Sequence, residues 1–265
     1  MDTAIGLIGG LGLFLFGMFY MGDGLQKAAG SKMKDILAAL TKNKLMGVLL
    51  GTLVTGVIQS SSATTVMVVG FVNAGLMNLS QAVGIIMGAN IGTTVTAFLV
   101  TLNITKLATF MVGVGVAMML ASKKRKIKSM AEVIVGFGIL FIGMDLMKTA
   151  MEPLETNPGF ISLMTKFDNP LLGILVGFVM TAILQSSSAT TGLLIALAAT
   201  GIITFKQAYP VVFGQNIGTC VTALLASIGA NKTAKRAAVI HLLFNVTGTL
   251  LFMLFLKNPV TWMIY

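Results

Sequence analysis

The sequence predicts an all-α, polytopic membrane protein made of two repeats with opposite orientations. Its composition is that of a membrane protein: 56% of the 265 residues are hydrophobic and only 10% are charged, whereas soluble domains carry about 25% charged residues. Several apolar runs approach the roughly 20 residues that a membrane-spanning helix requires. The repeats are indicated by the heptapeptide Gln-Ser-Ser-Ser-Ala-Thr-Thr, which occurs at residues 59–65 and 185–191, 126 positions apart (185 − 59).

The offset of 126 residues recurs along most of the chain. The tetrapeptide Asn-Ile-Gly-Thr occurs at 90–93 and again at 216–219. Glycines pair at the same offset, among them Gly12 with Gly138, Gly17 with Gly143, Gly47 with Gly173, and Gly88 with Gly214. Chance does not place so many matches at one offset, so the chain contains an internal duplication. We predict a first repeat over residues 1–126 and a second over 127–265, which together form one transport domain.

The first repeat opens with an apolar run, Ala4–Leu25, which predicts a membrane span. The basic segment 27–44 follows it. The first heptapeptide then divides a longer apolar run into arms of 14 and 12 residues, Leu45–Ile58 and Val66–Met77. Both arms are too short to cross a bilayer, and irregular backbone at that depth is tolerated only inside protein or beside a water-filled cavity. We therefore predict a re-entrant helical hairpin.

Two further crossings complete the first repeat. Ala82–Leu102 is interrupted by Gly88–Thr94, whose glycines and asparagine weaken a helix, so this span is predicted to be discontinuous. Gly92 is predicted to allow a sharp backbone turn at this interruption, and its counterpart Gly218 is predicted to do the same in the second repeat. The third crossing is Leu107–Ala121.

The second repeat follows the same plan. Its predicted elements are a span with its core at Val135–Thr149, a polar loop Met151–Asn169, a re-entrant hairpin over Leu171–Ile203, a discontinuous span over Pro210–Ile228 and a last crossing over Ala237–Leu256. Three crossings per repeat is an odd number, so the second repeat must lie upside-down relative to the first.

Basic residues predict the orientation of the chain. With the N-terminus outside, 13 of the 18 Lys and Arg residues lie inside, in the loops 27–44, 123–128 and 231–236, in agreement with the positive-inside rule. Both termini are then outside, and the two hairpin tips meet near the middle of the bilayer, where transporters place their substrate sites. The net charge of +10 reflects this orientation and contact with anionic headgroups, and we predict no nucleic-acid partner.

The hairpin tips have the chemistry to bind an oxyanion. The second arm begins at the tip, where backbone N–H groups lack helical partners and serine hydroxyls can cap the helix. Such a helix end attracts anions. The interrupted spans offer amide and hydroxyl groups of the same kind. The predicted oxyanion-binding residues are Ser60, Ser61, Ser62, Ser186, Ser187, Ser188, Asn90, Asn216, Thr93 and Thr219.

An anion bound at these tips finds no cationic side chain. The segments 45–77, 82–102, 171–203 and 207–231 contain no Lys, Arg, Asp or Glu, and a helix end supplies only about half a charge. A multivalent anion therefore favours co-bound cations, and carbonyl, hydroxyl and amide oxygens suit Na⁺. We expect Na⁺ as the coupling ion at the hairpin tips only, and no cofactor. The predicted sodium-binding residues are Gln59, Gln185, Thr64, Thr65, Thr190, Thr191, Thr94, Gly92 and Gly218.

These motifs resemble the type II sodium–phosphate cotransporter family. The resemblance rests on the two Gln-Ser-Ser-Ser segments, each followed by Gly-X-Asn-Ile-Gly-Thr, on Gln207–Pro210 and on the segment 236–245. It implies inorganic phosphate as the substrate of the oxyanion-binding residues, sodium as the coupling ion, and alternating access between inverted repeats. The chain is then a multi-pass protein of the cell inner membrane, in contact with the lipid bilayer. It ends at Tyr265, so we expect a bacterial member without the C-terminal cytosolic domain; a homodimer is compatible with this interpretation.

Two alternatives to sodium-coupled phosphate symport stay open. One is a transporter of another oxyanion, such as arsenate, sulfate or a small carboxylate. The other is a non-coupled, channel-like membrane protein whose duplicated tips serve packing. We predict no enzymatic activity, because no Ser–His–Asp set, metal cluster or nucleotide-binding glycine loop has a suitable context in this sequence.

Several single residues carry more specific predictions. Asp145 lies within a predicted span, near its outer end, where an interfacial or packing role is expected. His241 and Asn245 share a helix face, and we expect buried hydrogen bonds from both. Pro210 is predicted to mark the start of a span, where its missing N–H costs little. Cys220 stands where the first repeat has Thr94.

Overall fold

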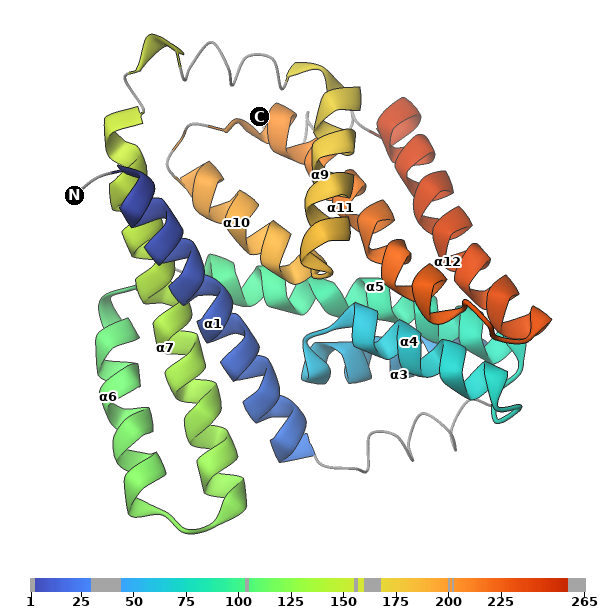
Figure 1. Cartoon of the computed structure of the whole chain (residues 1–265), viewed down its shortest axis with the longest axis horizontal. Helices are drawn as coiled ribbons and strands as arrows, with labels where there is room; N and C mark the ends of the chain where they lie inside the picture. The colour runs from blue at the N-terminus through green and yellow to red at the C-terminus, as the bar shows by residue number, and fades with distance from the viewer. Residues whose placement is uncertain are drawn as a thin grey trace.

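The fold was determined as a computed structural model, which describes residues 3–29, 44–102, 105–154, 157–159, 168–199, 201 and 203–256. All secondary structure in these residues is helical (Figure 1), which confirms the all-α prediction. Most of the predicted basic loop 27–44 and much of the predicted loop 151–169 lie outside the described residues, as do residues 257–265. In chain order the elements are α1 (Thr3–Ala29), α3 (Lys44–Ile58), α4 (Ser61–Asn73), α5 (Leu79–Thr101), α6 (Thr105–Ala121), α7 (Arg125–Met151), η1 (Glu152–Leu154), α9 (Pro170–Leu184), α10 (Ser187–Ala199), α11 (Phe205–Ala226), α12 (Lys232–Leu251) and the π-helical turn η3 (Phe252–Leu256).

Four of the six predicted crossings are helices long and apolar enough to span a membrane. They are Thr3–Ala28, Leu79–Thr101, Arg125–Met151 and Lys232–Phe255. The other two are α6, which has 17 residues, and α11, whose 22 residues include several polar side chains. Large apolar side chains are exposed along many helices, for example Leu53, Phe110 and Ile183. Lipid is the environment in which such a surface is stable, so the chain is a multi-pass membrane protein.

The duplication is visible in the element boundaries. The limits of α9 and α10 are those of α3 and α4 shifted by 126 residues (170 − 44 and 187 − 61), and α11 begins 126 residues after α5 (205 − 79). The exposed stripe of α3, which contains Leu45, Leu49 and Leu53, recurs on α9 at the same offset as Leu171, Leu175 and Val179. The two halves therefore build the same pair of short helices.

The predicted interruption of the two spans is wrong, because α5 and α11 are each one continuous helix. Their polar residues are satisfied within the helix: the Asn90 amide donates to the Ile86 carbonyl at 3.0 Å and the Thr93 hydroxyl donates to the Ala89 carbonyl at 3.0 Å. Asn and Thr side chains that bond back to their own helix leave its backbone ladder intact. The spans thus stay helical through the segment where a break was expected.

Glycines in α5 and α11 serve close helix packing instead of a turn. A Cβ atom on Gly92 would lie 2.6 Å from the Thr52 carbonyl oxygen of α3, and one on Gly218 would lie 2.6 Å from the Phe178 carbonyl oxygen of α9. Small residues at such positions let two helix backbones approach closely. The predicted role of Gly92 and Gly218 in a sharp turn is therefore wrong. Gly92 lets α5 pack closely against α3, and Gly218 lets α11 pack closely against α9.

The long helices and the two short helix pairs, α3–α4 and α9–α10, pack in groups. In one group α1 packs along α7, and α6 packs against α7 as well (Figure 1). In the other group α3, α4, α5 and α12 share a buried apolar cluster. The pair α9–α10 packs against α11, and α10 also contacts α5 and α7. Each short pair, which we call a broken-helix pair, therefore packs against a long continuous helix. This helix is α5 for the pair α3–α4 and α11 for the pair α9–α10.

Candidate functional site: two helix breaks

Each short helix pair is interrupted by a two-residue break. Gln59 and Ser60 separate α3 from α4, and Gln185 and Ser186 separate α9 from α10. Gln59 has φ = +59° and Gln185 has φ = +55°, and they are the only non-glycine residues with positive φ among those the structure describes. A left-handed residue ends a helix, and its rarity outside glycine points to a local constraint. The break is shorter than predicted, because residues 61–65 and 187–191 are already helical.

The two glutamines are held by matching sets of hydrogen bonds. The Oε1 atom of Gln59 accepts a hydrogen bond from Thr96 of α5 at 2.8 Å, and the Oε1 atom of Gln185 accepts one from Thr222 of α11 at 2.6 Å. The Nε2 atoms donate to the carbonyls of Gly56 and of its counterpart in α9. These bonds fix the side chains that the left-handed backbone would otherwise leave free, so each break has a defined shape.

Thr96 and Thr222, which bond to the glutamines of the breaks, are not among the residues predicted from the sequence. Both lie within the repeated Val-Thr-Ala at 95–97 and 221–223. This repetition is a signal in the sequence that could have identified them, whereas the prediction places the binding groups in Asn-Ile-Gly-Thr, one residue before Val-Thr-Ala in each half. Because α5 and α11 are continuous, it is the residues further along these helices that reach the breaks.

The first serine of each break caps the helix that follows. The Ser60 hydroxyl accepts a hydrogen bond from the Ala63 N–H at 3.1 Å, and the Ser186 hydroxyl accepts one from the Ala189 N–H at 3.2 Å. This confirms the predicted N-cap role for Ser60 and Ser186. The next two serines of each break, which were also N-cap candidates, lie inside the first turn of α4 and α10.

Threonine pairs tie the two arms of each break together. The Thr55 hydroxyl donates to Thr64 at 2.9 Å, and the hydroxyls of Thr181 and Thr190 lie 2.8 Å apart. All four side chains are buried. A hydrogen bond between arms in an apolar surrounding resists separation of the arms, so these pairs stabilise the bend. The hydroxyls of Thr64 and Thr190, predicted to bind sodium, are thereby engaged inside the protein.

The breaks of the two halves contact each other near the centre of the fold (Figure 1). The Ser62 hydroxyl lies 3.4 Å from the carbonyl oxygen of Gln185, and the Ser188 hydroxyl lies 3.4 Å from the hydroxyl of Thr96. The two serines are no more than 8% exposed, so they face protein and not lipid. The predicted meeting of the two tips is confirmed, and it places serine hydroxyls from both halves in one polar region.

Two serine hydroxyls in this region have no hydrogen-bond partner among the described residues. Ser61 and Ser187 are 6% and 5% exposed, and in the described part of the chain neither hydroxyl has a hydrogen-bond partner. Each serine is the first residue of a helix, where the first backbone N–H groups also lack intrahelical partners. Neither hydroxyl oxygen is among the fully buried, unpartnered side-chain atoms of the described residues, so each is accessible to a small ligand, and each lies beside free N–H groups. The combination of donors suits an oxyanion.

Cation ligands are available at the same place. Carbonyls in the last turn of α3 and α9 lack helical N–H partners, and a helix C-terminus attracts cations. The Gly56 and Ala182 carbonyls in these turns already accept hydrogen bonds from the glutamine Nε2 atoms. Hydroxyl and amide oxygens lie beside them. Hard oxygen atoms of this kind could hold Na⁺. The described residues contain no group of three or more His, Cys, Asp or Glu that could hold a metal ion.

Other residues predicted for the site lie along α5 and α11. Thr94 is exposed and donates to the Ile91 carbonyl at 2.7 Å, and Thr219 donates to the Gln215 carbonyl at 3.0 Å. The remaining members of this set are Asn90, Thr93 and Asn216. Within the described residues, none of the five is hydrogen-bonded to a break residue. The Thr65 hydroxyl donates to the Ser62 carbonyl at 3.1 Å and the Thr191 hydroxyl to Gln215 Oε1 at 2.7 Å.

Three single-residue predictions are decided by the structure. The Asn245 amide donates to Cys220 Sγ at 3.2 Å and to the carbonyl of His241 at 3.1 Å, which confirms its buried hydrogen-bonding role. The prediction for His241 is wrong, because both ring nitrogens are buried and have no partner among the described residues. Pro210 is also misplaced by the prediction: it lies inside α11, five residues after the helix begins, and packs against Gly173.

A helical membrane protein with two matching broken-helix pairs, whose buried polar breaks meet at the centre, has the architecture of a membrane transporter. The comparison with known families agrees with this class. The chain belongs to the Na⁺/Pi-cotransporter family, whose sequence profile matches residues 13–149 and 157–263.

Individual relatives come from bacteria and animals. The chain is 34% identical to the uncharacterized protein YqeW of Bacillus subtilis over 92% of this chain and 79% of that protein. It is 30% identical to YjbB of Escherichia coli K12, which is provisionally named an inorganic phosphate export protein, over 96% of this chain and 47% of that protein. It is 46% identical to human sodium-dependent phosphate transport protein 2B over 30% of this chain and 12% of that protein. The chain thus spans about half the length of YjbB. No solved structure was found to match it.

Proposed function

We propose that this protein transports inorganic phosphate together with Na⁺, and that the two helix breaks form the transport site. The observation that carries the proposal is a pair of largely buried serines, Ser61 and Ser187, at the starts of α4 and α10. Their hydroxyls have no hydrogen-bond partner among the described residues and are accessible to a small ligand. Each break offers a hydroxyl and free backbone N–H groups, and phosphate presents several oxygen atoms that accept hydrogen bonds. The contact between the breaks allows one anion to be held from both sides.

Sodium coupling follows from the charge balance of the site. The helices that build the breaks, α3, α4, α9 and α10, carry one charged side chain, Lys44, at the far end of α3. Two helix ends supply only about half a positive charge each, which is less than the charge of phosphate. Co-bound Na⁺ at the carbonyl ends of α3 and α9 supplies the remainder. The residues proposed as sodium ligands are the break residues Gln59 and Gln185 and the neighbouring oxygen atoms of the threonines named above.

Alternating access follows from the duplication. Each half, residues 1–126 and 127–265, contributes one broken-helix pair, and an odd number of crossings per half inverts the second pair relative to the first. Rocking of the halves then opens the shared site to one side at a time. The N- and C-termini lie outside in this arrangement, and the loops 123–128 and 231–236 lie inside the cell.

The names of relatives support phosphate as the substrate. Human protein 2B is named as a sodium-dependent phosphate transport protein, and YjbB is named for phosphate export. Sodium-driven symport predicts uptake of phosphate when sodium is higher outside. Arsenate, sulfate and small carboxylates are competitors whose effect on phosphate flux defines the selectivity of the site.

The test is uptake of radiolabelled phosphate into proteoliposomes, with and without an imposed sodium gradient. We expect saturable uptake that requires the gradient. Ser61→Ala and Ser187→Ala should each raise the apparent KM for phosphate about tenfold, because a hydrogen bond to a charged group contributes about 1.5 kcal/mol or more. Ser80→Ala, at an exposed serine of α5, is the matched control. Uptake that ignores the sodium gradient, or normal KM values in both break variants, contradicts the proposal.

A further inference from the structure

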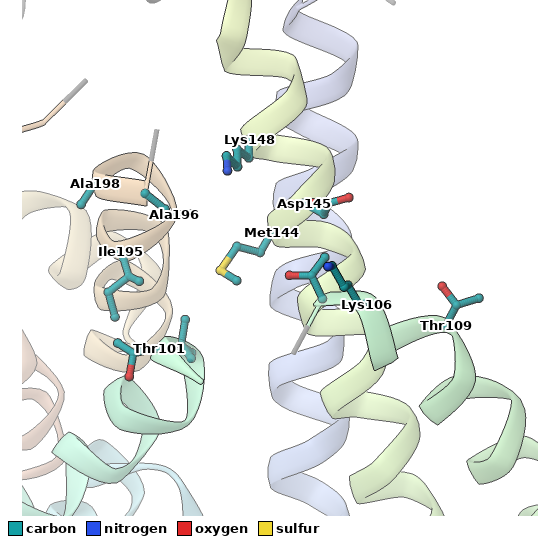
Figure 2. Close-up of a pocket in the computed structure, with 12 residues that line it drawn as sticks. Thr101, Lys106, Thr109, Met144, Asp145, Lys148, Ile195, Ala196 and Ala198 are labelled. Carbon is teal, nitrogen blue, oxygen red and sulfur yellow. The ribbon is translucent and has the colours of Figure 1, made fainter. Parts of the chain in front are cut away.

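A cavity of about 800 Å³ lies beside the breaks and is not part of them. It is bounded by the end of α5, the start of α6, the last two turns of α7 and the end of α10. Figure 2 shows Ile195 and Ala196 of α10 on one side and Met144 and Lys148 of α7 on the other. The predicted topology places all four of these helix ends at the outer face of the membrane.

Three of the described residues that line the cavity are charged. They are Lys106, Asp145 and Lys148, and together they carry a net charge of +1. The only ion pair among the described residues joins Lys27 to Glu132, so no carboxylate lies within 4.0 Å of either cavity lysine in the described chain. Asp145, for which an interfacial or packing role was expected, is exposed and lines this cavity. The lysine ammonium groups are therefore available to an anion.

The cavity is connected to the breaks by two helices. On α5, Val100 lines the cavity, and Thr96, one turn earlier on the same buried face, contacts Ser188. Four residues of α-helix span about 6 Å. On α10, Ile195 lines the cavity about two turns after Ser188. The cavity thus lies against the outer side of the polar region where the two breaks meet.

We propose that this cavity is an electropositive vestibule in which Lys106 and Lys148 collect phosphate before it enters the breaks. The inference rests on the proposed function and adds to it a second, weaker anion site with a different chemistry. The breaks bind without cationic side chains, whereas the vestibule binds through two lysines that stay exposed to water. Exposed charges raise the local concentration of an oppositely charged ligand without holding it tightly, which suits a site that must pass its ligand onward.

Asp145 limits the strength of this site. Its carboxylate reduces the net charge of the wall from +2 to +1 and so reduces the time for which a multivalent anion stays. Removing a lysine and removing the aspartate must therefore act in opposite directions. A structural role for these exposed side chains predicts no such opposition.

The first experiment measures the potential of the cavity without transport. Thr101→Cys places a thiol at the exposed end of α5, where Thr101 lines the cavity, and the native Cys220 is fully buried. The ratio of its reaction rates with a sulfonate-bearing and a trimethylammonium-bearing methanethiosulfonate should fall about fivefold when Lys106→Gln and Lys148→Gln are added, and it should rise with Asp145→Asn. Both changes should vanish at 1 M salt, where the Debye length is roughly 3 Å. A ratio that none of these substitutions alters overturns the proposal, whatever the transport assay gives.

The second experiment measures phosphate uptake at low ionic strength. Lys106→Gln and Lys148→Gln should each raise the apparent KM about threefold and leave the maximal rate unchanged, while Asp145→Asn should lower the KM. Lys206→Gln removes a charge from the exposed start of α11, outside the cavity, and should have no effect. If the wild type transports phosphate and the cavity variants match it, the vestibule is disproved and the break site stands. If the wild type transports no phosphate in a sodium gradient, the proposed function itself fails.

Discussion

The two broken-helix pairs are alike at the break and unlike in their surroundings. Both have a left-handed glutamine, a capping serine and a buried threonine pair, with hydrogen-bond lengths that agree within 0.2 Å. They differ in how α4 and α10 attach to the long helix beside them. Thr191 of α10 bonds to Gln215 of α11, whereas Thr65 of α4 bonds within its own turn, because Ala89 stands where α11 has Gln215.

The difference extends to the last helix of each half. α12 packs against α11 and also reaches α4 and α5, but its counterpart α6 packs against α7. As a result Cys220 of α11 is fully buried beneath Asn245, while the equivalent Thr94 of α5 is exposed. The comparison teaches that the geometry of the break is set by its own heptapeptide, by one threonine of the arm before it and by one threonine of the adjacent long helix. The packing around it can diverge without altering that geometry.

The largest effect is expected from the glycines that bring the scaffold helices close. A side chain on Gly88 or Gly214 would overlap the backbone of α3 or α9. We expect Gly88→Ala and Gly214→Ala each to destabilise the protein by about 3 kcal/mol, seen as a lower thermal midpoint and less monodisperse protein in detergent. Gly70→Ala is the control, since nothing lies within 4 Å of its added Cβ. Tolerance of the substitution in one half alone would show that the two pairs are braced differently.

A smaller effect is expected at the threonines that hold the glutamines. Thr96 donates to Gln59 and also lies beside Ser188, whereas Thr222 donates to Gln185 only. Thr96→Val should therefore cost about 2 kcal/mol and Thr222→Val about 1 kcal/mol, measured by thermal unfolding, and phosphate uptake should fall more in the first variant. Thr247→Val, at an exposed position of α12, is the control. Equal losses in the two variants would mean that the contact with Ser188 contributes nothing.

The bond that exists in one half only should be detectable as a coupling energy. In a double-mutant cycle, Thr191→Val and Gln215→Ala should show an interaction of about 1 kcal/mol in the free energy of unfolding. The counterpart Thr65→Val should cost less than Thr191→Val, because its partner is a carbonyl of the same helix. Additive effects of the first two substitutions would remove this difference between the pairs.

The smallest effect is expected at Cys220. Its sulfur accepts a hydrogen bond from Asn245, but sulfur is a weak acceptor. Cys220→Ser supplies a better acceptor of similar size, so its free energy of unfolding should stay within about 1 kcal/mol of the wild type, and Cys220→Ala should be less stable than Cys220→Ser. The reverse order would show that burial of sulfur, and not the bond to Asn245, stabilises this contact.

The breaks could be predicted from the sequence, but the helices beside them could not. A run of polar residues inside an apolar stretch has few stable solutions in a bilayer, so the heptapeptides indicated both the break and its duplication. Glycine is ambiguous: Gly92 is compatible with a turn and with close packing, and the choice depends on the backbone of α3, which lies far away in the sequence. Thr96 and Lys106 were missed for the same reason, since their roles arise only from neighbours in space.

The contact between the breaks leaves a second set of partners unused. Ser62 meets the Gln185 carbonyl, but Ser188 meets Thr96 and not the Gln59 carbonyl. Exchanging the roles of the halves would pair Ser188 with the Gln59 carbonyl and Ser62 with Thr222. The chain contains all four of these groups. One sequence therefore supplies the groups for two alternative sets of contacts of near-equal chemistry between the halves, of which this structure contains one.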